Sequence, residues 1–243
     1  MTALSSSGRM DYKEIDMKQL SILIATALLL GAEPVRFDHK VREMYFAAFA
    51  GDKEALAKAM IITEATLKEN PNHAEALVWH GSGVFFQSGE KFRAGDMQAG
   101  MEMMQKDTGM MDRAVELEPK NIGVRIPRGA AYFAGSRNMP PRMGQPLVEK
   151  GVEDYESSWD MQKDDLSQFS QHSVGELWIG IADGNSRLGK KERAGEFFRM
   201  IQEKLPNTAW SAKADKWFAE GKLTGRDAQC VGCHLGSPKA FKN

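Results

Sequence analysis

Apolar side chains recur at helical spacing through most of this chain. In residues 53–69 (KEALAKAMIITEATLKE), the charged side chains fall opposite a face formed by Leu56, Ala59, Met60 and Thr63. From Asp38 to Gly221 the sequence shows this periodicity and no alternation of apolar and polar residues of the kind that marks strands. The pattern predicts an all-α fold.

Proline-containing turns divide the helical region at three points. Pro71, Pro119 and Pro206 each follow one helical stretch and precede another. A helix stops at such a point because proline has no backbone N–H and clashes with the preceding turn. A recurring stop of this kind indicates a helical repeat. We therefore expect a row of helical hairpins over residues 33–221, closed by a helix near 209–220.

One segment, residues 175–208, shows the repeat most clearly. Small and large apolar residues there follow the pattern W…L-G…A…F…A…P, at Trp178, Ile181, Ala182, Ala194, Phe198, Ile201 and Pro206. The segment resembles the tetratricopeptide repeat family, although Asn185 stands where that family has Tyr and Ile201 where it has Ala. The resemblance covers roughly residues 39–208. It implies a tetratricopeptide-like helical-hairpin solenoid of about four hairpins, which binds other proteins through its repeats.

Two of the units are longer than a tetratricopeptide repeat. Pro71 and Pro119 are 48 residues apart, against about 34 in the family. We expect an insertion near residues 90–105 and another in the following unit, where the Pro- and Gly-rich stretch 135–147 predicts a loop. Such insertions often project from the binding face of a solenoid.

The N-terminus has the features of an export signal. Ile22 to Leu30 is continuously apolar, too short to span a bilayer but of the length of a signal-peptide core, and Lys18 precedes it. Residues 1–32 are predicted to be a leader and signal peptide, with Met17 as a candidate start and a cut after Ala32. A periplasmic or otherwise exported protein is expected, with an uncleaved anchor as the alternative.

Composition and charge narrow the function classes. The chain has 243 residues, with 32 Lys and Arg against 33 Asp and Glu, whereas a nucleic-acid binder is normally basic. The mean hydropathy of −0.44 excludes a polytopic membrane protein, and no integral membrane segment is expected after signal cleavage. No P-loop, Gly-x-Ser-x-Gly, HExxH or calcium-loop motif occurs. The carboxylate pairs Asp164–Asp165 and Glu153–Asp154 lie in charged helical stretches and are expected to face solvent, so we predict no catalytic residues.

Candidate chemistry is concentrated near the C-terminus. The sequence has two cysteines, Cys230 and Cys233, and His234 follows directly. This CxxCH motif is the attachment signature of c-type haem. Two thiols at this spacing can both reach the vinyl groups at one porphyrin edge, and the next residue then presents an imidazole to the iron. We predict that residues 222–243 bind one covalent haem c through Cys230 and Cys233, with His234 as axial ligand.

Other uses of this motif fit less well. A zinc site needs four ligands and only three are local, while a thioredoxin-like pair expects a βαβ setting. A simple disulfide is possible in an exported chain. The motif resembles that of cytochromes c, although those place it near the N-terminus, and its C-terminal position resembles cytochromes c-prime, which often have five-coordinate iron. The tail 221–243 has a net charge of +3.

A sixth iron ligand would have to come from the helical body, because the nine residues after His234 contain no Met or His. Candidates are His172, Met161 and Met200, and the choice affects the potential. A stripe of methionines at helical spacing is expected to pack in the hydrophobic core; it consists of Met97, Met101, Met104 and Met111. The expected function is single-electron transfer with a redox partner protein. The alternatives are a haem sensor or peroxidase-like protein with an open sixth position, and a scaffold without haem.

Overall fold

The computed structural model describes residues 36–137 and 139–224. The chain divides into two units, residues 1–36 and residues 37–243, and the fold below is that of the second. Its described part is entirely helical. The helices are α2 (Asp38–Phe49), α3 (Lys53–Glu69), α4 (Ala74–Arg93), α5 (Met97–Leu117), α6 (Ile122–Ser136), α7 (Pro141–Gln162), α8 (Gln171–Arg187), α9 (Lys191–Lys204) and α10 (Ala209–Glu220).

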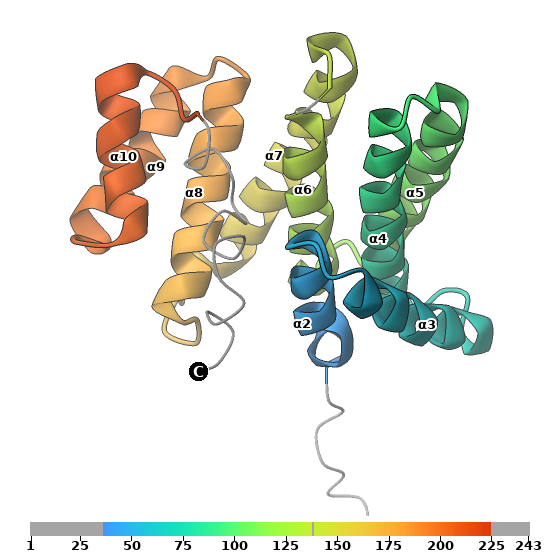
Figure 1. Cartoon of the computed structure of the whole chain (residues 1–243). Coiled ribbons are helices and arrows are strands. Elements are labelled where there is room, and N and C mark those ends of the chain that lie inside the picture. The colour runs from blue at the N-terminus through green and yellow to red at the C-terminus, as the bar shows by residue number, and fades with distance from the viewer. Residues whose placement is uncertain (1–35, 138, 225–243) are drawn as a thin grey trace, which may run out of the picture. The chain divides into compact units, whose positions relative to one another are not determined.

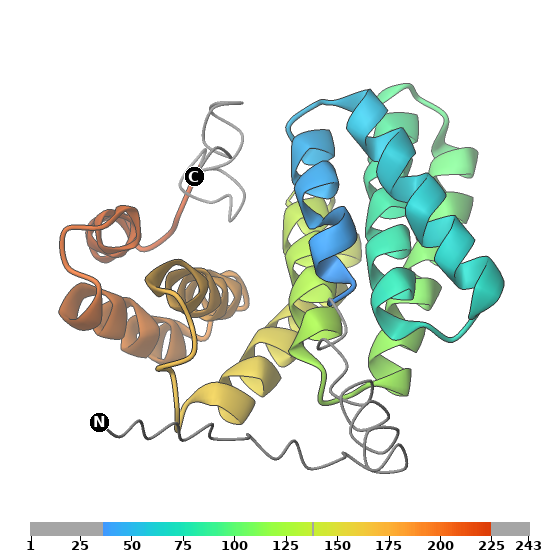
Figure 2. The same ribbon diagram turned by 90° about the horizontal axis from the view of Figure 1, so that it is seen from below.

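Consecutive helices pack as antiparallel hairpins (Figures 1 and 2). The pairs are α2 with α3, α4 with α5, α6 with α7, and α8 with α9, and α10 then packs on α9. Contacts between α4 and α6 and between α7 and α8 join one hairpin to the next. The all-α, helical-hairpin prediction is therefore confirmed, including the closing helix over residues 209–220.

The predicted helix ends are also confirmed. α3 has the bounds given by its sequence pattern, and its buried face includes Leu56, Ala59 and Thr63. α3, α5 and α9 each end just before the turns that contain Pro71, Pro119 and Pro206. The helices after these turns begin with side-chain caps, which satisfy backbone N–H groups that have no partner within a helix.

Helix α6 contributes to two hydrophobic clusters. Val124 and Tyr132 belong to a cluster that extends over α2 to α6, whereas Phe133 belongs to a second cluster that extends over α6 to α10. A helix with apolar side chains on two faces can be sandwiched between hairpins. The residues behind the tetratricopeptide resemblance lie in the second cluster, where Trp178, Ile181, Ala194, Phe198 and Ile201 are all buried.

The predicted loop over residues 135–147 is wrong. α6 continues to Ser136 and α7 begins at Pro141, so only residues 137–140 connect them. Pro141 occupies the first turn of α7, where its missing N–H costs nothing. Pro146 is accommodated within the same helix. The Pro-rich composition therefore marks a helix start and not a long loop.

The extra residues expected near 90–105 are present, and they lengthen two helices without forming a separate loop. α4 runs to Arg93, and a short turn containing Gly95 leads directly into α5. Gly95 adopts a φ of 83°, which glycine reaches without steric cost. The extra residues of this unit lie in the helices themselves, since α4 has 20 residues and α5 has 21.

Candidate functional site

The predicted haem-attachment residues Cys230, Cys233 and His234 lie outside the described residues, which end at Thr224. The structure does describe how the chain reaches that segment. Trp217 of α10 stacks on Phe198 of α9, with ring centroids 4.6 Å apart. Its indole Nε1 donates a hydrogen bond of 2.7 Å to Ser186 Oγ on α8. Leu223, just beyond α10, is buried in the same cluster, so the segment leaves the body from a firmly packed point.

The three candidate sixth ligands lie on three different helices. His172 is exposed in the first turn of α8, where its ring meets Trp210 edge to face at 5.5 Å. Met161 is 42% exposed near the end of α7. Met200 is half-buried on α9 and packs against the cluster over α6 to α10. Met200 lines a cavity whose lining includes neither His172 nor Met161.

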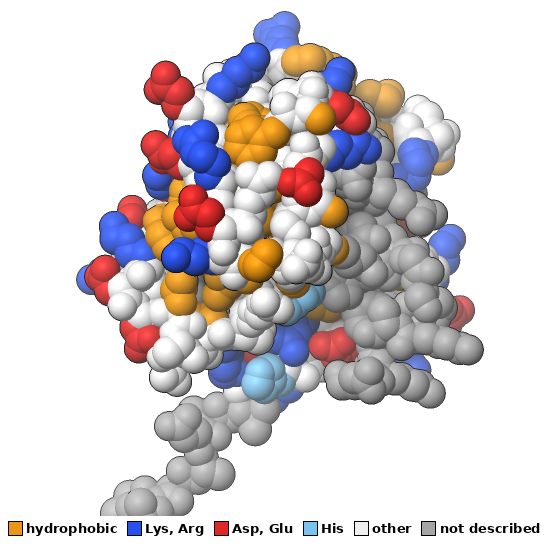
Figure 3. All heavy atoms as spheres, turned by 90° about the vertical axis from the view of Figure 1, so that its left-hand side faces the viewer, with side chains coloured by type: hydrophobic (Ala, Val, Ile, Leu, Met, Phe, Trp, Pro, Cys, Tyr) orange, Lys and Arg blue, Asp and Glu red, His pale blue; other side chains and the backbone are white. Residues whose placement is uncertain are grey.

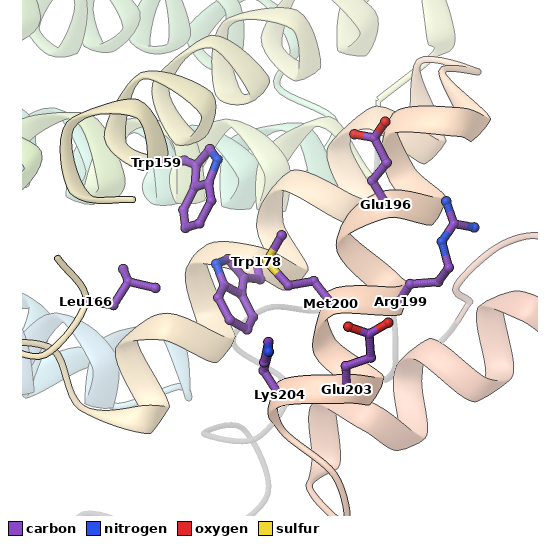
Figure 4. A pocket seen from close by; sticks show the side chains of 8 residues that line it. All are labelled: Trp159, Leu166, Trp178, Glu196, Arg199, Met200, Glu203 and Lys204. Atoms are coloured by element: carbon purple, nitrogen blue, oxygen red, sulfur yellow. The ribbon is translucent and has the colours of Figure 1, made fainter. Parts of the chain in front are cut away.

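That cavity has a volume of about 600 Å³ and opens to solvent. Its walls come from the end of α7, the α7–α8 connection, α8 and α9, and the side chains that line it are Trp159, Leu166, Trp178, Glu196, Arg199, Met200, Glu203 and Lys204 (Figure 4). We call it the tryptophan cavity. Its inner wall is apolar and its rim, on α9, has two carboxylates and two cations.

Two tryptophans form the inner wall. Trp159 meets Trp178 edge to face with ring centroids 6.1 Å apart, and it meets Phe197 in the same way at 5.6 Å. The side chain of Met200 extends from α9 toward Trp178 (Figure 4). Trp178 is 4% exposed, and its Nε1 has no hydrogen-bond partner among the described residues. A buried N–H without an acceptor is costly, so the packing of the Trp178 ring has to offset this cost.

The sequence did not predict this cavity. Trp159 follows Val152 and Tyr155 at helical spacing, and both of these are buried. That spacing predicts core packing, and it gives no sign that the hydrophobic face continues into an open cavity. Two residues in the sequence could have pointed to it. Trp178 stands on a position of the repeat pattern, and Met200 directly precedes another such position, Ile201.

The burial of Asp154 was predicted wrongly from the sequence. It was expected to face solvent, but it is fully buried on α7. Arg125 and Arg128 of α6 both bind its carboxylate. Two arginines at helical spacing within the apolar stretch 122–133 are a signal that a buried carboxylate must face them. This cluster joins α6 to α7, and none of its three residues lines the tryptophan cavity.

Asp107 of α5 is buried in a different way. It is fully inaccessible, and neither carboxylate oxygen has a hydrogen-bond partner within the described residues. Burial raises the pKa of Asp107 to about 7. His80, also buried, shares a hydrogen bond of 2.9 Å with Thr63 Oγ1 through Nδ1, and burial lowers its pKa. His80 is thus a core histidine with a partner.

The methionine stripe on α5 changes character along its length. Met97 is 58% exposed, whereas Met111 is fully buried and packs with the cluster over α2 to α6. Met104 is partly buried against the same cluster. The far end of the stripe is therefore core, as expected for methionine in irregular gaps.

Within residues 36–137 and 139–224, no group of three or more His, Cys, Asp or Glu side chains could hold a metal ion. None of the helices described combines the length and apolarity needed to cross a bilayer. Comparison with known proteins finds no family model that matches this chain and no similar curated protein.

Proposed function

We propose that this chain is an exported monohaem c-type cytochrome that transfers single electrons. The observation that supports this best is that both cysteines of the sequence stand at CxxC spacing with His234 directly after them. The donor set fits the group, because two thiols provide thioether links and an imidazole is a common axial ligand of haem iron. When bound, the haem supplies an iron that alternates between ferric and ferrous states.

The opposite end of the chain supports the same proposal. Haem is attached to CxxCH on the exported side of a membrane, and the apolar run Ile22–Leu30 behind Lys18 is typical of a secretory signal. The two features are expected together in a protein that is exported and then loaded with haem.

The helical hairpins would position the haem and dock a redox partner protein. A tetratricopeptide-like body is suited to protein binding, and the C-terminal tail has a net charge of +3 that could meet an acidic partner. The face that includes α9 and α10 mixes acidic and basic side chains, with hydrophobic side chains between them (Figure 3). Partner recognition through such a face would depend on shape and on local charge pairs more than on an electrostatic field of one sign.

The experiment is to express the full chain with an export pathway and the haem-attachment machinery, then stain a denaturing gel for haem and measure the intact mass. Only thioether-linked haem survives the gel. The wild-type chain should stain and weigh one haem more than its polypeptide, and a Cys230→Ala, Cys233→Ala double variant should do neither. A wild-type chain at its bare mass would overturn the proposal and leave an exported helical adaptor.

Absorption spectra then separate an electron carrier from a sensor or peroxidase-like protein. A low-spin spectrum indicates two axial ligands, as expected for an electron carrier. A high-spin ferric form that binds carbon monoxide when reduced would favour the open-site alternative. In His234→Ala the axial spectrum should change, and an unchanged spectrum would remove His234 from its assigned role.

A further inference from the structure

Two methionines of the described structure lie at the surface of the helical body. Met97 on α5 is 58% exposed and Met161 on α7 is 42% exposed, whereas Met111 on α5 is fully buried. We propose that Met97 and Met161 are oxidation sites, which a peroxide converts to methionine sulfoxide while the protein stays folded and Met111 stays reduced. This modification requires no haem, so it stands apart from the proposed electron transfer.

The chemistry requires an accessible sulfur and a peroxide. The lone pair of the thioether sulfur attacks one oxygen of hydrogen peroxide, and an S–O bond forms as the O–O bond breaks. The departing hydroxide takes up the proton of the transferred oxygen and leaves as water. The sulfur loses two electrons and the peroxide gains them. Because a thioether has no proton to lose, access to the sulfur decides which methionine reacts first.

The position of Met97 accommodates the product. Met97 is the first residue of α5 and directly follows the N-cap Asp96, whose side chain accepts a hydrogen bond from the backbone N–H of Ala99. The start of the helix is therefore capped without any contribution from the methionine side chain. Met97 belongs to neither hydrophobic cluster of the described residues, so a sulfoxide at this position stays in water and displaces no packed side chain.

Met161 has a comparable position near the end of a helix. It is the last residue but one of α7, which ends at Gln162. Trp159, two residues earlier, packs against the cluster over α6 to α10, whereas Met161 is part of neither cluster within the described structure. Residues two apart do not share a face of a helix, which explains why Trp159 is packed while Met161 is open to solvent.

Met111 is protected by the close approach of α4 to α5. Its Sδ accepts a hydrogen bond of 3.5 Å from Ser82 Oγ, and its Cγ lies 2.9 Å from the position that a Cβ on Gly81 would take. An added sulfoxide oxygen would crowd this contact. Oxidation also turns a flexible apolar side chain into a polar one, which disrupts a core. Met111 therefore reacts only after α4 and α5 separate.

Helix α5 provides an internal comparison, because its methionines differ in exposure along one helix. Met101 and Met104 are half-buried and lie between Met97 and Met111. Oxidation should therefore be fastest at Met97, slower at Met101 and Met104, and slowest at Met111. Met111 should react at least about a hundredfold more slowly than Met97, since the open form of a stable fold makes up well under about 1% of the molecules.

The test treats the full chain with dilute hydrogen peroxide and assigns each added oxygen to a residue by peptide mass spectrometry with fragmentation. The Cys230→Ala, Cys233→Ala variant is treated in parallel, so that the order of oxidation is also measured without the haem motif. Met97 and Met161 should each gain one oxygen first in both proteins, while the circular dichroism spectrum stays unchanged. Methionine sulfoxide reductases should then remove these oxygens from the folded protein, because both side chains are accessible.

Two controls separate exposure from local sequence. In urea, where the fold is lost, Met97, Met161 and Met111 should react at similar rates. Met97→Leu should abolish the reaction at this position and leave the rate at Met161 unchanged, because the two residues lie on different helices. The proposal would be overturned by a Met97 or Met161 that stays reduced, by a Met111 that reacts as fast as Met97 in the folded protein, or by the same order of rates in urea. Wild-type protein without covalent haem would overturn the proposed function alone.

Discussion

Arg128 on α6 donates two hydrogen bonds to the buried carboxylate of Asp154 on α7, from Nε to Oδ2 and from Nη2 to Oδ1, each 2.7 Å long. Arg125 adds a third bond of 2.9 Å to Oδ1. Arg128 also binds Asp112 of α5, so one guanidinium ties three helices together. Buried arginines of this kind depend on their carboxylate, because a buried charge left alone is strongly unfavourable.

We therefore predict that Asp154→Ala lowers the free energy of unfolding by about 3–5 kcal/mol, since it leaves the buried guanidinium of Arg125 without its carboxylate and that of Arg128 with Asp112 alone. Denaturant unfolding followed by circular dichroism measures the change. Glu153→Ala, at the exposed neighbouring position, should alter stability by no more than about 0.5 kcal/mol. Equal effects of the two substitutions would contradict the role of the cluster.

A second prediction concerns the close approach of α8 to α7. Gly180 faces the ring of Tyr155, and Gly129 of α6 faces the other edge of the same ring. A Cβ on Gly180 would overlap Tyr155, so Gly180→Ala should destabilise the protein by roughly 1–3 kcal/mol through overpacking.

The control for this prediction is Gly109→Ala in α5. Within the described structure no side-chain or foreign backbone atom lies within 4 Å of the position that its Cβ would take. Alanine is the better helix former there, so this variant should gain roughly 0.5–1 kcal/mol. Thermal or denaturant unfolding that shows the same sign for both variants would refute the close-packing argument.

The helices and their ends could be predicted because local rules decide them. The apolar face of residues 53–69 and the turns at Pro71, Pro119 and Pro206 depend on residues close together in the chain. The loop predicted for residues 135–147 is wrong because proline ends a helix when it lies in the interior but is tolerated in the first turn, which is where Pro141 lies in α7. Composition alone could not distinguish a loop from the start of a helix.

The burial of Asp154 and the tryptophan cavity could not be predicted for a different reason. Both depend on which helices meet, and the partners of Asp154 lie 26 and 29 residues away in the sequence. The proposed haem attachment rests on five consecutive residues and needs no fold to be predicted, but these residues lie outside the described part of the chain. Of the three candidates for a sixth ligand, His172 and Met161 are exposed and Met200 is half-buried.

The third prediction is a pH dependence that arises from Asp107. Its pKa is about 7 in the folded protein and about 3.9 in an unfolded chain. Between these values the folded state keeps a proton that the unfolded state releases, so stability should fall as pH rises, by up to about 1.4 kcal/mol per pH unit. Above pH 7 this contribution is fully lost.

Urea unfolding at pH 5 and pH 8 measures this effect. Asp107→Asn mimics the neutral acid and should lose less stability than the wild type between the two values. His80 also titrates, and burial lowers its pKa. Its contribution to stability therefore rises with pH below about pH 6.5, opposite to that of Asp107. His80 is present in both proteins, so its contribution cancels in the comparison. Parallel pH profiles would show that Asp107 is ionised in the fold.

The fourth prediction concerns processing of the N-terminus. If the segment 1–32 is a signal peptide, the mature chain begins at Glu33. Intact-mass measurement of the exported protein should give residues 33–243 plus one haem. A mature protein that retains residues 22–30 would support the anchor alternative, and membrane fractionation would then find it with the membranes.

The last prediction concerns Trp217, which holds α10 against α8 and α9. Trp217 is 7% exposed and Phe218, its neighbour on α10, is 43% exposed. Trp217→Ala removes both the stacking on Phe198 and the hydrogen bond to Ser186, and should cost about 3–5 kcal/mol. Phe218→Ala is the matched control and should cost less, because 43% of the Phe218 side chain stays in water in the folded protein, against 7% for Trp217. Denaturant unfolding followed by circular dichroism measures both losses. Equal losses from the two substitutions would contradict the role of Trp217 in fixing α10 to the body.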